Sequence, residues 1–144
     1  MGYTHYWTLP SPKQWQQAFP QLVSDALLIA QSLPNIPLCL TYGEETEPPL
    51  FSVDHGIRLN GRDWSHEDFV LTRTREASFK FCKTARKPYD VVVTAILLRA
   101  SMIAGLEVRS DGDWDEWMGA REVVAKLWPG EEVECPWDLK VPTE

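Results

Sequence analysis

The chain has 144 residues, of which 44% are hydrophobic and 24% charged, and its formal net charge is −7. A chain of this length fits one domain that buries a core without disulfides or metals, and its composition is that of an ordinary soluble globular protein. The negative charge opposes contact with a long phosphate backbone, so we expect neither long nucleic acid nor a membrane among its partners.

The three cysteines are widely separated and odd in number, which argues against a disulfide framework and a structural zinc site and favours a reducing compartment. The N-terminus lacks the basic region and apolar run of a signal peptide. The longest apolar stretch, Val91 to Gly105, is too short to span a bilayer. We therefore expect a cytoplasmic protein without a cofactor or metal.

The predicted elements begin with a short strand over Tyr3 to Trp7, which is rich in β-formers. A helix follows, with Ser11 as N-cap, Pro12 at the first helical position and apolar side chains at helical spacing as far as residue 30. Pro20 is expected either to kink this helix or to begin a second segment. Two strands are expected next, over 38–42 and 51–59, the second closed by a turn at Asn60-Gly61.

The second half of the chain predicts two more strands, over 69–74 and 78–83, and then a helix over 91–104. This helix is apolar almost all round, so it belongs in the centre of the domain. A strand over 106–109 precedes a last helix, which the Asp113 and Glu116 capping pattern begins. With an irregular tail over 131–144, the prediction is a single α+β domain over 1–144: a mainly antiparallel sheet covered by about three helices.

Basic residues are concentrated between Arg73 and Lys87, in a chain that is acidic elsewhere. This segment contains one acid, Glu76, and six basic residues: Arg73, Arg75, Lys80, Lys83, Arg86 and Lys87. Like charges in so short a segment repel one another, so the cluster indicates a site for an anion. The alternative is a solvated basic turn that pairs with acidic loops nearby.

Within this cluster, a predicted strand ends, a polar turn follows and the buried helix begins. Backbone donors at a helix N-terminus attract anions, and the cations beside them add formal charge. We expect Lys83, Arg86 and Lys87 to neutralise phosphate, with Thr84 and Tyr89 as hydrogen-bond donors. The segment has no glycine-rich phosphate loop and is therefore not a P-loop.

The first predicted strand supplies candidates for holding a base. Alternation puts Tyr3, His5 and Trp7 on one face and Tyr6 on the other. One of these faces would line a pocket and stack a planar group, and the alternative is a core strand with polar tips. Two residues near the end of a later strand, Arg58 and Asn60, are supporting candidates for the lining of the pocket, together with His66.

Metal binding and nucleophilic catalysis have little support in the sequence. The histidines and acids near Asn60 fit no metal spacing. The alternating acids Asp111, Asp113 and Asp115 resemble a calcium loop, but Glu116 stands where that loop needs glycine. Cys82 lies in an electropositive segment, yet no partner histidine is fixed by spacing.

Several phrase-like segments resemble a family of small uncharacterised proteins of phages and prophages whose chains begin Met-Gly-Tyr-Thr-His-Tyr-Trp. These segments are 1–7, 81–84, 86–90 and 110–112. The family has no assigned catalytic activity, so the resemblance carries over no site residue. It implies a context in which small accessory proteins counter host defence, some of them by sequestering cyclic or ADP-ribose-type nucleotides that carry defence signals.

From these observations we predict a non-catalytic protein that binds and sequesters an anionic nucleotide-like small molecule, in the host cytoplasm if a phage encodes it. The first alternative is a protein-interaction inhibitor that presents the acidic loop Glu44-Glu45-Thr46-Glu47 to a basic host protein. The second alternative is an enzyme acting on a nucleotide, for which the sequence names no catalytic pair. The sequence leaves open whether the chain forms an oligomer.

Overall fold

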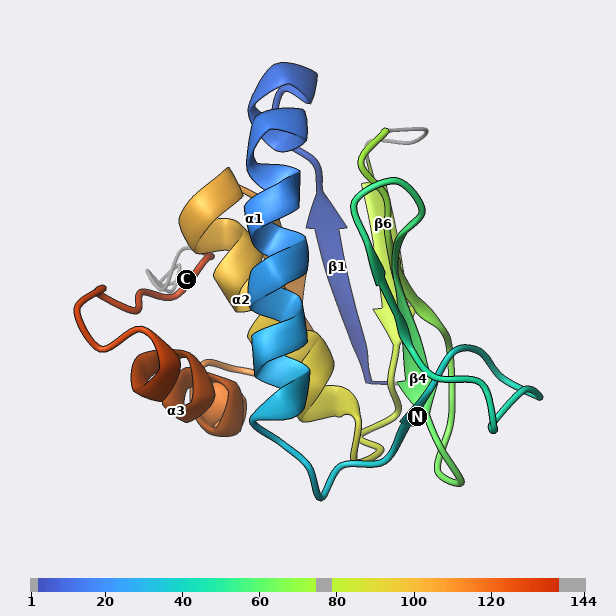
Figure 1. Ribbon diagram of the computed structural model, residues 1–144. Coiled ribbons are helices and arrows are strands. Elements are labelled where there is room, and N and C mark those ends of the chain that lie inside the picture. Colours follow the sequence, from blue (N-terminus) through green and yellow to red (C-terminus); the bar gives the residue numbers. More distant parts are fainter. Residues whose placement is uncertain (1–2, 75–78, 138–144) are drawn as a thin grey trace.

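The structure is a computed structural model that describes residues 3–74 and 79–137 (Figure 1). Arg75 and Glu76 of the basic cluster, the opening Met1-Gly2 and the tail beyond residue 137 lie outside the described residues. The elements, in chain order, are β1 (Thr4–Thr8), α1 (Pro12–Gln31), β2 (Leu38–Cys39), β3 (Leu50–Ser52), β4 (Gly56–Gly61), β5 (Phe69–Leu71), β6 (Phe79–Lys83), α2 (Asp90–Ala104), β7 (Glu107–Ser110), η1 (Asp115–Trp117) and α3 (Met118–Leu127).

The first strand is the centre of a three-stranded antiparallel sheet with the order β6-β1-β7. Tyr6 lies opposite Phe81 on β6 and opposite Arg109 on β7. Successive side chains of a strand point to opposite faces. Tyr3, Trp7 and other side chains of the inner face are buried, whereas Phe79 and Phe81 are 55% exposed. The sheet therefore has one face in the core and one in solvent.

A second antiparallel sheet has the order β2-β4-β3, and β5 also pairs with β4. The predicted single strand over 51–59 is wrong, because the chain forms a hairpin there between β3 and β4. In the turn of this hairpin, His55 N donates to Ser52 Oγ. Gly56 adopts a left-handed backbone conformation with φ +93°. The predicted turn at Asn60-Gly61 is also wrong: both residues belong to β4.

A single helix, α1, runs through Pro20 rather than splitting there. Pro20 lacks the N–H that would bond to the Gln16 carbonyl one turn earlier. That carbonyl instead accepts a hydrogen bond from Arg73 Nε at 3.3 Å. At the start of the helix, Ser11 Oγ accepts from Gln14 N, which confirms the predicted N-cap.

The second helix, α2, is the core helix that the apolar run predicts. Ten of its residues are buried, and it packs against both α1 and α3. In Figure 1 the three helices lie to one side of strands β1, β4 and β6. The predicted α+β domain with antiparallel strands covered by about three helices is confirmed, and the strands form two sheets where one was predicted. Among the described residues, no helix is long and apolar enough to cross a membrane.

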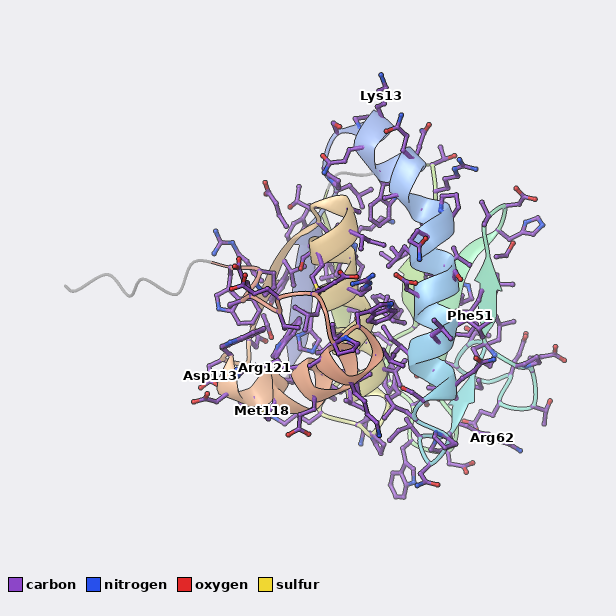
Figure 2. The ribbon with its side chains drawn as sticks, turned by 60° about the vertical axis from the view of Figure 1, so that its left-hand side comes forward. Lys13, Phe51, Arg62, Asp113, Met118 and Arg121 are labelled. Atoms are coloured by element: carbon purple, nitrogen blue, oxygen red, sulfur yellow. The ribbon has the colours of Figure 1, made fainter. Side chains whose placement is uncertain are left out.

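The predicted capping pattern before the last helix is present. Asp113 Oδ1 accepts from Glu116 N at 2.9 Å, and Glu116 Oε1 accepts from Asp113 N at 3.0 Å. This reciprocal pair begins η1, which leads directly into α3. Asp113, Met118 and Arg121 lie together at this end of α3 in Figure 2, and the Arg121 guanidinium lies 4.4 Å from the centre of the Trp114 ring.

Candidate functional site

Three segments that are far apart in the sequence meet at one end of the β6-β1-β7 sheet. They are the start of β1, the turn after β6 and the loop after β7. Thr84 N donates to Tyr3 O at 3.0 Å, and Asp111 N donates to Thr4 O at 2.9 Å. Thr4 N in turn donates to Asp111 Oδ2 at 3.0 Å. The structure thus brings together the segments on which the sequence analysis concentrated.

On the inner side of this junction, His5 is fully buried and held at both ring nitrogens. Its Nε2 lies 2.6 Å from Asp90 Oδ1, and its Nδ1 lies 2.8 Å from Ser110 Oγ. Thr84 Oγ1 also donates to Asp90 Oδ1. The order of contacts, serine to histidine to aspartate, is that of a hydrolytic triad, but the two ring nitrogens are exchanged, because a triad histidine contacts its serine through Nε2 and its aspartate through Nδ1.

The hydrogen bonds of Ser110 make this array a structural pin. Its Oγ accepts from Gly112 N at 2.9 Å and from Trp117 Nε1 at 3.1 Å. A hydroxyl has two lone pairs and one proton, and Ser110 Oγ is surrounded by two N–H donors, His5 Nδ1 and the Tyr3 hydroxyl. The Ser110 hydroxyl is therefore engaged in holding the junction together. The array joins β1 and β7 to α2 and η1, and sequence reasoning missed it because its members are 85 and 105 positions apart.

Tyr3 is buried beside His5, with the two ring centroids 5.1 Å apart. Burial, followed by the negative charges of Asp90 and Glu116, raises the pKa of its phenol to about 12. Its hydroxyl also packs against Gly112, where a Cβ would overlap it. Tyr3 is therefore packed within the junction. Its ring, which we expected to hold a base, contacts other residues of the protein instead.

The phenol of Tyr3 gives the protein an alkaline instability that can be measured. Because the pKa is about 12 in the folded chain and near 10.0 in the unfolded chain, its contribution is complete below pH 10 and is lost as the pH rises from 10 towards 12. Tyr3→Phe is expected to reduce the fall in unfolding free energy in that range by about 1 kcal/mol per pH unit. Urea unfolding at closely spaced pH values measures it. If the free energy of unfolding of Tyr3→Phe falls with pH as steeply as that of the wild type, the Tyr3 phenol is not the cause of the alkaline instability.

The turn after β6 has an unusual backbone for residues with side chains. Ala85 and Arg86 have φ values of 54° and 59°, and Lys87 N donates to Thr84 O at 3.0 Å. Residues other than glycine rarely adopt this region, and such strain is often found at functional sites. Here the turn places the Arg86 guanidinium 3.9 Å from the centre of the Tyr3 ring and 2.8 Å from a Glu116 oxygen.

Other predicted ligand residues are engaged inside the protein. Tyr89 is buried, its hydroxyl donates to Glu67 O, and burial raises the pKa of its phenol. Asn60 is buried and donates to Asp68 Oδ1 at 2.8 Å, while Arg58 forms an ion pair with Asp68 at 2.8 Å. Burial opposes ionisation of Asp68, but hydrogen bonds from Thr41 and Asn60 outweigh it and lower the pKa. These side chains stabilise the loop before β5.

The predicted basic cluster is divided in space. Lys83, Arg86 and Lys87 remain together at the sheet end, and neither lysine forms an ion pair with a described residue. Lys80 points to the other side of β6, where it lines a hollow with Trp7. Arg73 bonds to α1. Since Arg86 is also paired with Glu116, the predicted cluster does not form one cationic surface.

The solvent-facing side of the β6-β1-β7 sheet carries a group of aromatic rings. We call this side the outer face; its outward-pointing residues are Tyr6, Thr8, Phe79, Phe81, Lys83, Glu107 and Arg109. The rings of Tyr6 and Phe79 are nearly parallel, with centroids 6.1 Å apart, and those of Phe79 and Phe81 are 6.5 Å apart. In the sequence, the alternation along 79–83 indicates that Phe79 and Phe81 share one face of a strand. The register of β6 on β1, which brings both rings to Tyr6, cannot be read from that pattern.

A hollow of about 340 Å³ lies at one side of the outer face. Its lining includes Tyr6 and Phe79 from the sheet, Arg109 from β7 and Trp137 from the segment after α3. We call it the Tyr6–Phe79 hollow. Of the residues predicted to hold a base, Tyr6 and Trp7 line the hollow, and Tyr6 is the one that is not buried, since Tyr3, His5 and Trp7 belong to the core side of β1. The hollow and the outer face together form the candidate site.

The described part of the chain contains no group of three or more histidine, cysteine and acidic residues that is arranged to hold a metal ion. The thiol of Cys82 is buried on the inner face, and burial followed by the charge of Glu67 raises its pKa to about 12. A thiol with so high a pKa is protonated at neutral pH and is a poor nucleophile.

Comparison of the chain with protein-family models, with curated proteins and with solved structures finds no match.

Proposed function

We propose that this protein binds an anionic nucleotide-like ligand on the outer face of its three-stranded sheet and holds it unchanged. The observation that carries the proposal is the pair of exposed rings, Phe79 and Phe81, next to Tyr6 and flanked by cations. Exposed apolar groups gathered on one surface are typical of binding sites. A planar base covers such rings well, because every base has a face that stacks on an aromatic side chain.

Cations lie at both ends of the aromatic group. Arg109 is opposite Tyr6 on β7, and Lys83 follows Phe81 as the next outward-pointing residue of β6. Either cation can contact a phosphate, and arginine can do so through two hydrogen bonds. Glu107 lies on the same face and the whole chain is acidic. This balance favours a ligand with few phosphates over a long nucleic-acid backbone.

The chemistry of the side chains favours binding of the ligand over its chemical conversion. The hydroxyl of Ser110 is engaged in holding the junction together, and the thiol of Cys82 is buried and protonated. The resemblance to phage proteins adds a context in which sequestration of a host signal would counter defence. A protein with this role needs affinity and slow release but no chemical step.

The experiment that tests the proposal is calorimetric titration of the purified chain with mononucleotides, linear and cyclic dinucleotides and ADP-ribose, followed by chromatography of the recovered ligand. We expect at least one nucleotide to bind and to be recovered intact. A ligand present at about 100 times its dissociation constant would also raise the stability of the fold by about 2.7 kcal/mol. Recovery of a changed product would make the protein an enzyme, and no binding by any nucleotide would contradict the proposal.

A second candidate function rests on the loop between β2 and β3. Tyr42 is 72% exposed there, and Glu44 and Glu47 on the same loop are also exposed. An aromatic ring among acids is a suitable contact for a basic protein surface. This function predicts salt-sensitive binding to a basic host protein that is lost when the loop glutamates are changed to glutamine. Changes at Phe79 or Phe81 would leave that binding unaffected.

A further inference from the structure

The aromatic group on the outer face is larger than the hollow beside it. Tyr6 and Phe79 line the hollow, whereas Phe81 does not. The Phe81 ring is nevertheless 55% exposed and lies 6.5 Å from that of Phe79. A ligand that only fills the hollow would leave this second ring in water.

The volume of the hollow limits what it can hold. At about 340 Å³ it is at the lower end of the range for small-molecule sites. It has room for one nucleoside, so a second base would have to lie outside it. The adjacent surface on which such a base can stack is Phe81.

We infer that the ligand carries two nucleobases joined through phosphate, one in the Tyr6–Phe79 hollow and the other stacked on Phe81. This inference rests on the proposed function and specifies the class of ligand. It accounts for both exposed phenylalanines, which a mononucleotide does not.

The cations on the outer face fit the same arrangement. Arg109 lines the hollow that would hold the first base, as does Glu107. Lys83 follows Phe81 along β6, and alternation directs it to the same side of the sheet. Each base would therefore have one cation beside it. The chemistry is that of a phosphodiester between two nucleosides, which is common to a cyclic dinucleotide and to a short single strand.

Three variants separate the contributions of the two positions. Phe81→Ser removes the second stacking surface and leaves the lining of the hollow intact. Phe79→Ser removes a ring that lines the hollow. Trp64→Ser is the matched control, because Trp64 is 60% exposed and lies between β4 and β5, outside the outer face. Circular-dichroism melting of each variant establishes that it is folded.

The test is calorimetric titration with a mononucleotide, with linear and cyclic dinucleotides of the same base, and with a linear tetranucleotide. We expect the better dinucleotide to bind the wild type about 5- to 150-fold more tightly than the mononucleotide, which is the range for one stacked base. Phe81→Ser should abolish this advantage while preserving mononucleotide affinity. Phe79→Ser should weaken every ligand. Tighter binding of the cyclic dinucleotide would identify a cyclic dinucleotide as the ligand, and tighter binding of the linear one would identify the end of a short single strand.

Three results would overturn the inference, and they differ in what they imply for the proposed function. Equal affinity for the mononucleotide and both dinucleotides would contradict the second base but leave nucleotide binding in place. A further increase from dinucleotide to tetranucleotide would show that a longer single strand is the ligand. If no nucleotide binds and sedimentation shows self-association that Phe81→Ser abolishes, a second copy of the chain covers the face, and both proposals fail.

Discussion

Arg99→Met is expected to lower the free energy of unfolding by about 3–5 kcal/mol, the usual cost of leaving a buried charge without its partner. The side chain of Arg99 is 4% exposed and that of Asp25 is 2% exposed, and Arg99 Nε lies 2.8 Å from Asp25 Oδ2. This pair joins α2 to α1 in the middle of the domain. Without the guanidinium, the Asp25 carboxylate keeps only the amide of Gln21 as a polar partner in the described structure.

Two further variants show whether the buried charge is the cause. Asp25→Leu with Arg99→Met removes both charges and is expected to recover most of the lost stability, since apolar replacement of a buried pair is often neutral. Glu131→Gln tests the second ion pair of Arg99, in which Arg99 Nη1 lies 2.7 Å from Glu131 Oε1. Glu131 is 47% exposed, so its loss should cost much less stability than the loss of Arg99. Urea unfolding followed by tryptophan fluorescence measures all three, and a double variant as unstable as Arg99→Met would contradict this explanation.

The second large effect is on ligand binding. Phe79→Ala with Phe81→Ala is expected to weaken binding of the preferred nucleotide by about 30-fold or more, because each base stacked on an aromatic ring contributes about 1–3 kcal/mol. Both rings are 55% exposed, and cross-strand aromatic contacts such as that of Phe79 with Tyr6 contribute about 0.2–1 kcal/mol each, so the double variant should remain folded. The double variant therefore separates binding from stability.

The controls for this double variant are chosen for matched exposure and for matched chemistry. Trp64→Ala removes an aromatic ring that is 60% exposed but lies between β4 and β5, outside the outer face. This variant should leave the affinity unchanged. Phe81→Tyr keeps a stacking surface and should retain most of the binding. Isothermal calorimetry measures each affinity. Undiminished binding by the double variant would place the ligand elsewhere on the molecule.

Local signals in the sequence predicted much of the fold. Ser11 at the start of α1 and the Asp113–Glu116 pair before α3 act through hydrogen bonds within four residues, so their effect is visible in a short window. The apolar run of α2 likewise predicted a core helix. The hairpin between β3 and β4 was missed because its turn at 53–55 has no glycine pair, and the actual Asn-Gly pair serves another purpose. At the end of β4, Asn60 Oδ1 accepts hydrogen bonds from Gly61 N and from His66 N, which lies in the loop that follows.

The candidate site was less predictable, because it depends on pairings between distant segments. Alternation correctly separated Tyr6 from Tyr3, His5 and Trp7, but it could not show which face of β1 packs against the helices. Phe79 joins Tyr6 only through the register of β6 on β1. Alternation along the predicted strand already puts Lys80 and Lys83 on opposite faces, but the pairing with β1 was needed to show that Lys83 lies on the face in solvent.

A two-dimensional NMR titration of the aromatic and amide resonances with the nucleotide that binds best would locate the ligand on the molecule. We expect the largest shift changes in the rings of Tyr6, Phe79 and Phe81 and in the backbone of β6 and β7. The buried rings of Tyr3 and Trp117 should change little, because they belong to the pin around His5. Shift changes centred on the loop around Tyr42, or on the buried array instead of the outer face, would contradict the account.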